Sequence, residues 1–260
     1  MLSSLTRSAL ILLQSRKIPG VIRQFARPPL RRALFGDGIS VTDYGITLTC
    51  HLDNGIEYHF ALGIHMGALK YCLALLESGS VFVDVGANCG LFSVAAAKIV
   101  GPDGRVLAIE PNPEMVTRLR TNIAENSASV VIAPEAVGET DGEAVLNIDG
   151  SDYGCSNVLE TQPSARQIRV PMTTLAAIVE RAHFDRVDVL KIDVEGYEDR
   201  VLLPFFSMAD PTLWPRHIFM ETRHSQNWQR DLMGELARIG YRVHWQDDDD
   251  AHLVLSGGTA

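Results

Sequence analysis

The 260-residue chain lacks any apolar run near the roughly 20 residues that a membrane-spanning helix needs. Cysteines are few: the four form no C-x-x-C pair and have no histidine at metal-ligand spacing, which indicates reduced thiols in a cytoplasmic protein. Basic residues are scarce in most of the chain. Residues 1–35 hold seven of the 23 Lys and Arg residues and no acid, so residues 36–260 carry 16 basic and 32 acidic side chains. This acidic body argues against a nucleic-acid partner, whose phosphates need clustered cations.

The basic residues 1–35 stand apart from this body. We expect them to form an N-terminal helical arm that packs on the domain. Two other interpretations stay open, because an Arg-rich segment without acids is also typical of an amphipathic helix on an acidic membrane surface and of an organellar presequence. The first of these would make the protein a peripheral membrane protein.

Residues 36–78 are predicted to decorate the main domain. Their β-type residues alternate with Gly and Asp, and the turn at Asp53-Asn54-Gly55 predicts a small antiparallel β-ribbon. A helical apolar stripe follows at residues 66–77.

Residues 79–260 are predicted to form one α/β domain, because strand-like and helix-like segments alternate there, as in a mostly parallel sheet. The expected strands are 81–85, 105–111, 130–137, 187–196 and 217–223. The expected helices are 90–100, 113–126, 174–182, 196–207 and 226–239. Two last β-like runs flank the aspartates 247–250, and so short a turn predicts an antiparallel pair.

The turn after the first strand lacks the G-x-G-x-x-G pattern of dinucleotide folds. Its glycines are Gly86 and Gly90, with Asn88 between them. The missing middle glycine disfavours a pyrophosphate, so a nicotinamide-dependent oxidoreductase is the alternative and not the first hypothesis. Glu110, at the end of the second strand, is placed to accept hydrogen bonds from a ribose diol, as in NAD and S-adenosylmethionine sites.

Four blocks in order, VFVDVGANCG, AIEPNP, APEAVGE and VDVLKIDVEGYE, resemble the signatures of the FkbM family of S-adenosylmethionine-dependent methyltransferases. The resemblance covers about residues 79–206; the family's Tyr-Glu pair ahead of the first block is replaced by His65-Met66. It implies a class I methyltransferase (Rossmann-like) fold: a seven-stranded, mostly parallel sheet with an antiparallel C-terminal hairpin. It also implies S-adenosyl-L-methionine as cofactor and O-methylation of a hydroxyl on a glycan or small metabolite.

The resemblance also assigns cofactor residues. Gly86, Asn88 and Gly90 are expected at the methionine end, and Glu110 at the ribose. Asn112 is expected near the adenine edge, and Glu135 and Ala136 beside the adenine ring. Asp84 is expected to brace the glycine turn. The polar segment 149–167 either shapes the acceptor pocket or is a disordered surface loop.

Methyl transfer is an in-line displacement that depends on positioning, and a hydroxyl acceptor must also lose its proton to a base or metal. The fourth strand supplies Lys191 and Asp193. Both are candidates at the methyl-transfer site and Asp193 is favoured, since it ends the strand beside the cofactor; Lys191 could instead be a structural partner of Asp84.

His224, beyond the fifth strand, is a candidate base, because histidine titrates near neutral pH; a solvated loop histidine is the other interpretation. Asp193, Glu195 and Glu221 could together hold a divalent metal, since carboxylates suit a hard cation, although a metal-free site is favoured. A module that binds the cofactor without catalysis is a further alternative.

Overall fold

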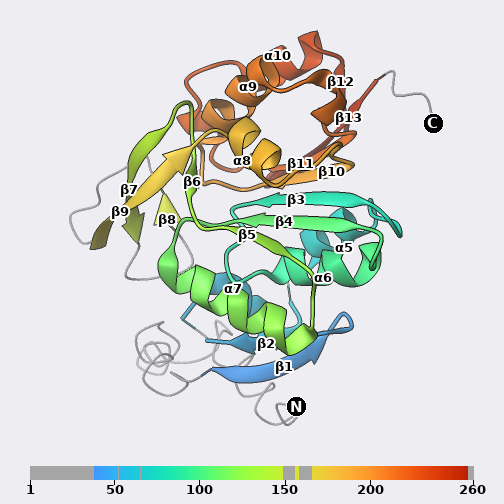
Figure 1. Cartoon of the computed structure of the whole chain (residues 1–260), viewed down its shortest axis with the longest axis vertical. Coiled ribbons are helices and arrows are strands. Elements are labelled where there is room, and N and C mark those ends of the chain that lie inside the picture. Colours follow the sequence, from blue (N-terminus) through green and yellow to red (C-terminus); the bar gives the residue numbers. More distant parts are fainter. Residues whose placement is uncertain (1–37, 52, 65, 149–155, 158–165, 257–260) are drawn as a thin grey trace.

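The computed structural model describes residues 38–51, 53–64, 66–148, 156–157 and 166–256 (Figure 1). In these ranges the central sheet has seven strands in the order β12-β13-β11-β10-β3-β4-β5. Strand β13 is antiparallel to both neighbours, and the other pairs are parallel. The predicted class I methyltransferase topology, with its antiparallel C-terminal hairpin, is confirmed. The predicted arm, residues 1–35, lies outside the described residues, and the proposed domain boundaries stay a prediction.

The elements alternate along the chain much as expected. The strands of the sheet are β3 (Val81–Val85), β4 (Arg105–Ile109), β5 (Val131–Ala133), β10 (Val189–Ile192), β11 (His217–Glu221), β12 (Tyr241–Gln246) and β13 (Asp250–Leu255). The helices are α4 (Gly55–Leu62), α5 (Gly67–Leu73), α6 (Leu91–Val100), α7 (Pro113–Asn126), α8 (Leu175–Arg181), α9 (Glu198–Met208) and α10 (Leu232–Arg238). Short 3-10 turns lie at Pro211–Leu213 and Ser225–Asn227.

Two expected ranges need correction. The predicted strand 130–137 is split into β5 and β6 (Ala136–Val137), and Pro134, which has no backbone N–H for a sheet ladder, stands between them. The predicted helix 226–239 begins only at Leu232, where the side chain of Asp231 caps the helix by accepting from the Gly234 N–H.

The buried strands place alternate residues on two faces of the sheet. Phe82, Val106 and Phe219 belong to an apolar cluster with α4, α5 and α6, whereas Val83, Leu107 and other alternate residues pack with α8, α9 and α10. Figure 1 shows α8, α9 and α10 on one side of the sheet and α5, α6 and α7 on the other. The carboxyl ends of the parallel strands therefore meet at one edge between two helical layers. Within the described residues, no helix has the length and apolarity for a bilayer span.

The β-ribbon is present, but its turn was predicted at the wrong place. Strands β1 (Ile39–Asp43) and β2 (Ile46–Cys50) pair around Tyr44-Gly45. Asn54 is instead the N-cap of α4, where its side chain accepts from the Ile56 and Glu57 N–H groups. An Asn-Gly pair suits both a hairpin and a helix start, and here the side-chain cap of Asn54 and the buried residues of α4 accompany the helix.

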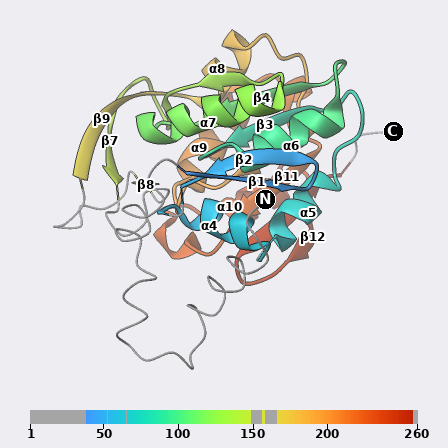
Figure 2. The same cartoon turned by 90° about the horizontal axis from the view of Figure 1, so that it is seen from below.

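A further sheet projects from one side of the molecule, where Figures 1 and 2 label β7, β8 and β9. Its order in the described chain is β6-β9-β7-β8, with β7 (Gly142–Ile148), β8 (Ser156–Asn157) and β9 (Arg166–Thr173). The sequence predicted β-like runs here, and the antiparallel pairing of β7 with β9 explains them. Most of the segment 149–167 lies outside the described residues, so its expected role at the acceptor pocket stays a prediction.

Candidate active site

The turn after β3 is held between two neighbouring strands. The N–H groups of Gly86 and Ala87 both donate to the Ile109 carbonyl at 3.0 Å. Gly86 has φ +78°, and a Cβ there would collide with the backbone carbonyl of Asp193. Glycine is therefore required at this position, where the turn passes against the end of β10.

Gly90 has a packing role in the structure that the sequence did not predict. It was expected to line the methionine end of the cofactor, but among the described residues it is not part of the pocket wall. Its φ is +89°, and a Cβ would collide with the side chain of Leu119 on α7. The glycine lets α6 begin close against α7, so it acts on the site through packing.

Asn88 is the central residue of the turn, with φ +54°. Its side-chain oxygen accepts from the Cys89 N–H and from the Asn54 side chain, each at 2.7 Å. Asn54 starts α4, and α4 is fixed to α7 by Arg118, whose buried guanidinium is 2.9 Å from Asp53 and 2.8 Å from Glu57. The region predicted as decoration thus supports the cofactor turn, which the sequence analysis missed although Asn54 lay in a conspicuous Asp-Asn-Gly motif.

Glu110 is buried at the end of β4 with both carboxylate oxygens engaged. One accepts from the Asn88 N–H and the other from the Asn112 N–H, each at 2.8 Å. Burial raises the pKa of Glu110 to about 7, against the opposing effect of these two hydrogen bonds. Asn112 is itself buried as the N-cap of α7 and, of the described residues, is not in the pocket wall; it contributes to the site by orienting Glu110. Its predicted place at the adenine edge is not supported.

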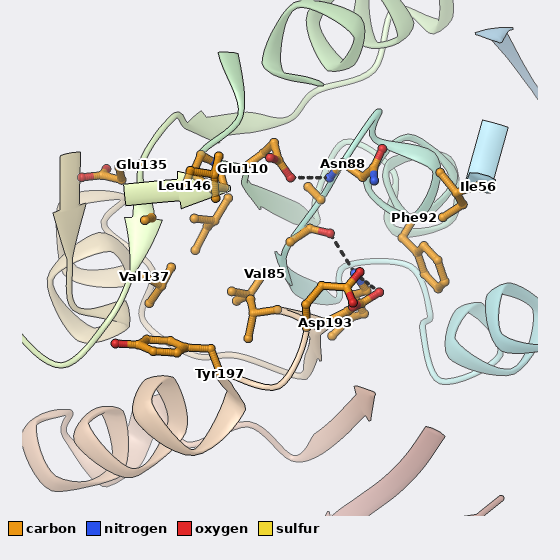
Figure 3. Close-up of a pocket in the computed structure, with 18 residues that line it drawn as sticks. Ile56, Val85, Asn88, Phe92, Glu110, Glu135, Val137, Leu146, Asp193 and Tyr197 are labelled. Carbon is orange, nitrogen blue, oxygen red and sulfur yellow. Dashed lines mark hydrogen bonds and ion pairs between the residues drawn. The ribbon is translucent and has the colours of Figure 1, made fainter. Parts of the chain in front are cut away.

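The pocket around Glu110 is elongated (Figure 3). Glu135, Val137 and Leu146 lie at one end, and Ile56 and Phe92 lie at the other. The full lining consists of Ile56, Val85, Gly86, Ala87, Asn88, Phe92, Ile109, Glu110, Pro111, Glu135, Ala136, Val137, Leu146, Lys191, Asp193, Val194, Glu195 and Tyr197. An apolar end for a flat ring, a buried acid for a diol and a polar turn for charged groups fit S-adenosylmethionine.

The predicted Gly86, Asn88, Glu110, Glu135, Ala136 and Asp193 all belong to this lining. Sequence reasoning missed Ile56, Phe92, Leu146 and Tyr197. Tyr197 stood in the recognised KIDVEGYE block and could have been found there. Phe92 stands in the first turn of α6, directly after the glycine turn, and could also have been found there. Ile56 and Leu146 come from elements whose approach to the turn depends on tertiary packing.

Lys191 and Asp84 lie side by side on β10 and β3, so their expected structural pairing is confirmed. The Lys191 Nζ is 3.4 Å from Asp84 and 3.7 Å from Asp193, and it donates to the Gly86 carbonyl at 2.9 Å. Asp84 also accepts from the Ser93 hydroxyl at 2.6 Å, which braces the turn against α6. Burial lowers the pKa of Lys191, but the two carboxylates outweigh it and the pKa is raised. Lys191 is thus a fixed cation and not a base.

Asp193 lies where the cofactor pocket meets a second hollow of about 570 Å³. Its side chain is 41% exposed, in contrast to the buried Lys191. Both cavities share Ile56, Phe92, Lys191 and Asp193. The rest of the wall of the second hollow consists of Gly55, His59, Met66, Gly67, Ala68, Leu69, Leu91, Ile192, Phe219, Glu221, Arg223, Asp247, Asp249 and Asp250. Asp193 can therefore contact ligands in both.

The predicted metal set is altered by the structure. Glu195, Glu221 and His224 come together, each offering an atom within 4.8 Å of the others, whereas Asp193 faces Lys191. The His224 Nδ1 is 3.3 Å from Glu195 and 3.2 Å from Glu221. His224 lines neither cavity in the described part of the chain, so its predicted role as the base is not supported. Burial, followed by Asp193, Glu195 and Glu198, raises the pKa of Glu221 to about 9.

The strand order, the glycine turn and the buried acid on β4 define a class I S-adenosylmethionine-dependent methyltransferase. Residues 84–243, more than half of the chain, match the family model of the methyltransferase FkbM domain. The chain belongs to this family and is an S-adenosylmethionine-dependent methyltransferase.

Individual relatives are similar to this chain over different shares of its length. An arsenite methyltransferase of Halobacterium salinarum is 27% identical over 172 residues, 55% of this chain but 43% of that protein, so the chain spans less than half of it. The methyltransferase sdnD of Sordaria araneosa is 28% identical over 216 residues, 68% of this chain and 82% of that protein. Among solved structures, an O-methyltransferase from Thermotoga maritima is similar over 76% of this chain and 67% of its own, with 13% identity and a TM-score of 0.47.

Proposed function

We propose that the protein transfers the methyl group of S-adenosylmethionine to a hydroxyl of a glycan or small metabolite. The observation that carries this proposal is the position of Asp193, whose partly exposed carboxylate stands at the junction of the cofactor pocket and the second hollow. A carboxylate there can accept a hydrogen bond from an acceptor hydroxyl and direct its oxygen toward the donor.

The residues of the chain divide the work between the two ligands. Gly86 and Asn88 hold the turn, and Glu110 offers its carboxylate to the ribose. When bound, S-adenosylmethionine supplies an electrophilic methyl group on a positively charged sulfur. Lys191 fixes Asp193 and the Gly86 carbonyl in one ion-pair network, so the acceptor contact and the donor turn keep a constant relation. Asp193 would receive the proton that the hydroxyl gives up as its oxygen bonds to the methyl carbon, while the carbon–sulfur bond breaks and S-adenosylhomocysteine remains.

The second hollow supports an acceptor rich in hydroxyl groups. Its volume suits a small molecule or one sugar residue of a glycan, and its wall combines charged side chains with Phe92 and Phe219. Carboxylates can bind sugar hydroxyls, and aromatic faces can pack against a ring. The strongly acidic wall would repel the phosphates of a nucleic acid, so we infer that nucleic acid is not the acceptor.

Arsenite, named for one relative, is not supported as the acceptor. Arsenic(III) is a soft centre that prefers thiolate ligands. The described cysteines, Cys50, Cys72 and Cys89, are buried, and none of them lines either cavity. Burial raises the pKa of each thiol, which keeps it protonated.

A screen with a labelled methyl donor over glycans, lipids and polyketides tests the proposal, with the new methyl located by mass spectrometry. We expect the label on an oxygen. Asp193→Asn should lower kcat by about 100-fold or more, the usual range for a lost general base, while the affinity for S-adenosylhomocysteine changes much less. Asp248→Asn, which removes an aspartate of the acidic turn 247–250 outside both linings, is the matched control. Label on nitrogen or carbon, or an unimpaired Asp193→Asn enzyme, would refute the proposal.

A further inference from the structure

The cluster of Glu195, Glu221 and His224 lies where β10 and β11 end. Glu221 is the last residue of β11, and Glu195 and His224 follow β10 and β11 in the adjacent turns. Because the two strands are parallel neighbours, their carboxyl ends bring these side chains to one point of the sheet edge. Glu195 lines the cofactor pocket and Glu221 lines the second hollow, so the cluster stands between the two ligand sites.

The spacing of the three side chains matches the coordination sphere of a small divalent cation. Ligand atoms at about 2.1 Å from an octahedral ion stand about 3.0 Å apart when they are cis and about 4.2 Å apart when they are trans. The His224 Nδ1 lies 3.3 Å from the Glu195 carboxylate and 3.2 Å from the Glu221 carboxylate, and all three ligand atoms lie within 4.8 Å of one another. One ion can therefore contact all three after small side-chain adjustments.

The charge around the cluster also favours a cation. Asp193 and Glu198 stand close to Glu221 in addition to Glu195. Lys191 is already engaged by Asp84 and Asp193. Glu198 accepts from the Val194 and Gly196 N–H groups and from the Trp228 indole, which hold it in place behind the cluster.

We propose that Glu195, Glu221 and His224 bind one divalent cation, of the class of Mn²⁺ or Mg²⁺, at the rim of the acceptor hollow. Two carboxylates and one imidazole form a mixed oxygen and nitrogen set, which suits Mn²⁺ best of the two. The ion site itself depends only on the three side chains. Its role rests on the proposed function: the cation would contact the acceptor hydroxyl and ease loss of its proton to Asp193.

Direct binding of Mn²⁺ to the full chain, stripped with EDTA, tests the site without any acceptor. Free Mn²⁺ is counted by electron paramagnetic resonance, and the heat of binding is measured in parallel. We expect one ion per chain. Glu221→Gln and His224→Gln should each weaken binding by about tenfold or more, whereas Asp248→Asn should leave it unchanged. Binding of S-adenosylhomocysteine to each variant verifies that it is folded.

Two results would overturn the proposal. The first is that the wild-type chain binds no Mn²⁺, which would mean that His224 and the two glutamates only pair with one another. The second is that Mn²⁺ binding survives Glu221→Gln and His224→Gln but is lost in Asp247→Asn or Asp249→Asn. That result would place the ion at the acidic turn. Neither result bears on the proposed O-methylation. A methyl group found on nitrogen or carbon would instead remove the proposed role of the cation at the acceptor hydroxyl, while the number of Mn²⁺ ions bound per chain would stay the same.

Discussion

Glu110 links cofactor binding to pH. Its pKa is raised to about 7, mainly by burial, so the carboxyl is ionised above neutrality and protonated below it. The ionised form accepts the hydrogen bonds of a ribose diol, while the protonated form must donate with one oxygen. We therefore predict that affinity for S-adenosylhomocysteine reaches a plateau above pH 7 and is lost as the pH falls through this value, by about tenfold per pH unit.

Replacement by glutamine should remove this dependence and also weaken the site. The two oxygens of Glu110 each accept a backbone N–H, from Asn88 and from Asn112. Glutamine has one oxygen and one NH2 group, so one of these buried donors would face another donor, at a cost of about 1–3 kcal/mol. Loss of the charged acceptor for the ribose costs a further ~1.5–3 kcal/mol, or about 10- to 150-fold in affinity.

Isothermal titration from pH 5.5 to 8.5 provides the assay. Near pH 7 wild-type binding should release protons, so the heat should depend on the ionisation enthalpy of the buffer. Glu110→Gln should bind weakly at every pH, with no such buffer dependence. The reasoning fails if wild-type affinity is constant across this range, or if Glu110→Gln keeps the wild-type pH profile, since another group would then control binding.

Two stability predictions concern residues away from the ligands. Gly90→Ala should lower the free energy of unfolding in a urea titration by about 1–3 kcal/mol, because φ is positive and the added Cβ collides with Leu119. Gly79→Ala is the control for backbone strain alone, since Gly79 has φ +84° but no atom within 4 Å of the added Cβ. Equal losses of stability in the two variants would refute the contribution of the collision. The second concerns His252, whose pKa is lowered to about 4 by burial and then by two neighbouring histidines. The unfolded chain takes up its proton first, so stability should fall by about 2 kcal/mol between pH 7.5 and pH 5; a His252→Phe protein with the same pH slope would contradict this assignment.

The predictable part of the site consists of residues whose position follows from the strand in which they stand. Glu110, Lys191 and Asp193 sit at or near the carboxyl ends of buried strands, and an alternating α/β pattern already places such ends together. Gly86 followed from the same pattern. For these residues the local sequence and the global fold give the same answer.

The remaining part depends on contacts between distant segments. Asp53-Asn54-Gly55 suits a hairpin as well as a helix start, and the choice agrees with a buried ion pair to Arg118, some 60 residues away in the sequence. The role of Gly90 depends on how closely α7 approaches. Neither approach leaves a local signal in the sequence, which is why the hairpin turn was misassigned and the packing role of Gly90 was not predicted.

The two cavities differ in where the residues that build them stand relative to the sheet. The donor turn is held by its backbone N–H groups, which donate to the Ile109 carbonyl and the Glu110 carboxylate, and by the Lys191 side chain. All three partners stand on or next to central strands. The second hollow is walled in large part by residues of α5, the start of α4 and the acidic turn 247–250, which lie at the periphery of the sheet. Peripheral side chains can change without disturbing strand register, whereas a change in the donor turn displaces β3, β4 and β10 together. The acceptor that we propose for this protein is therefore to be sought through the shape and charge of the second hollow.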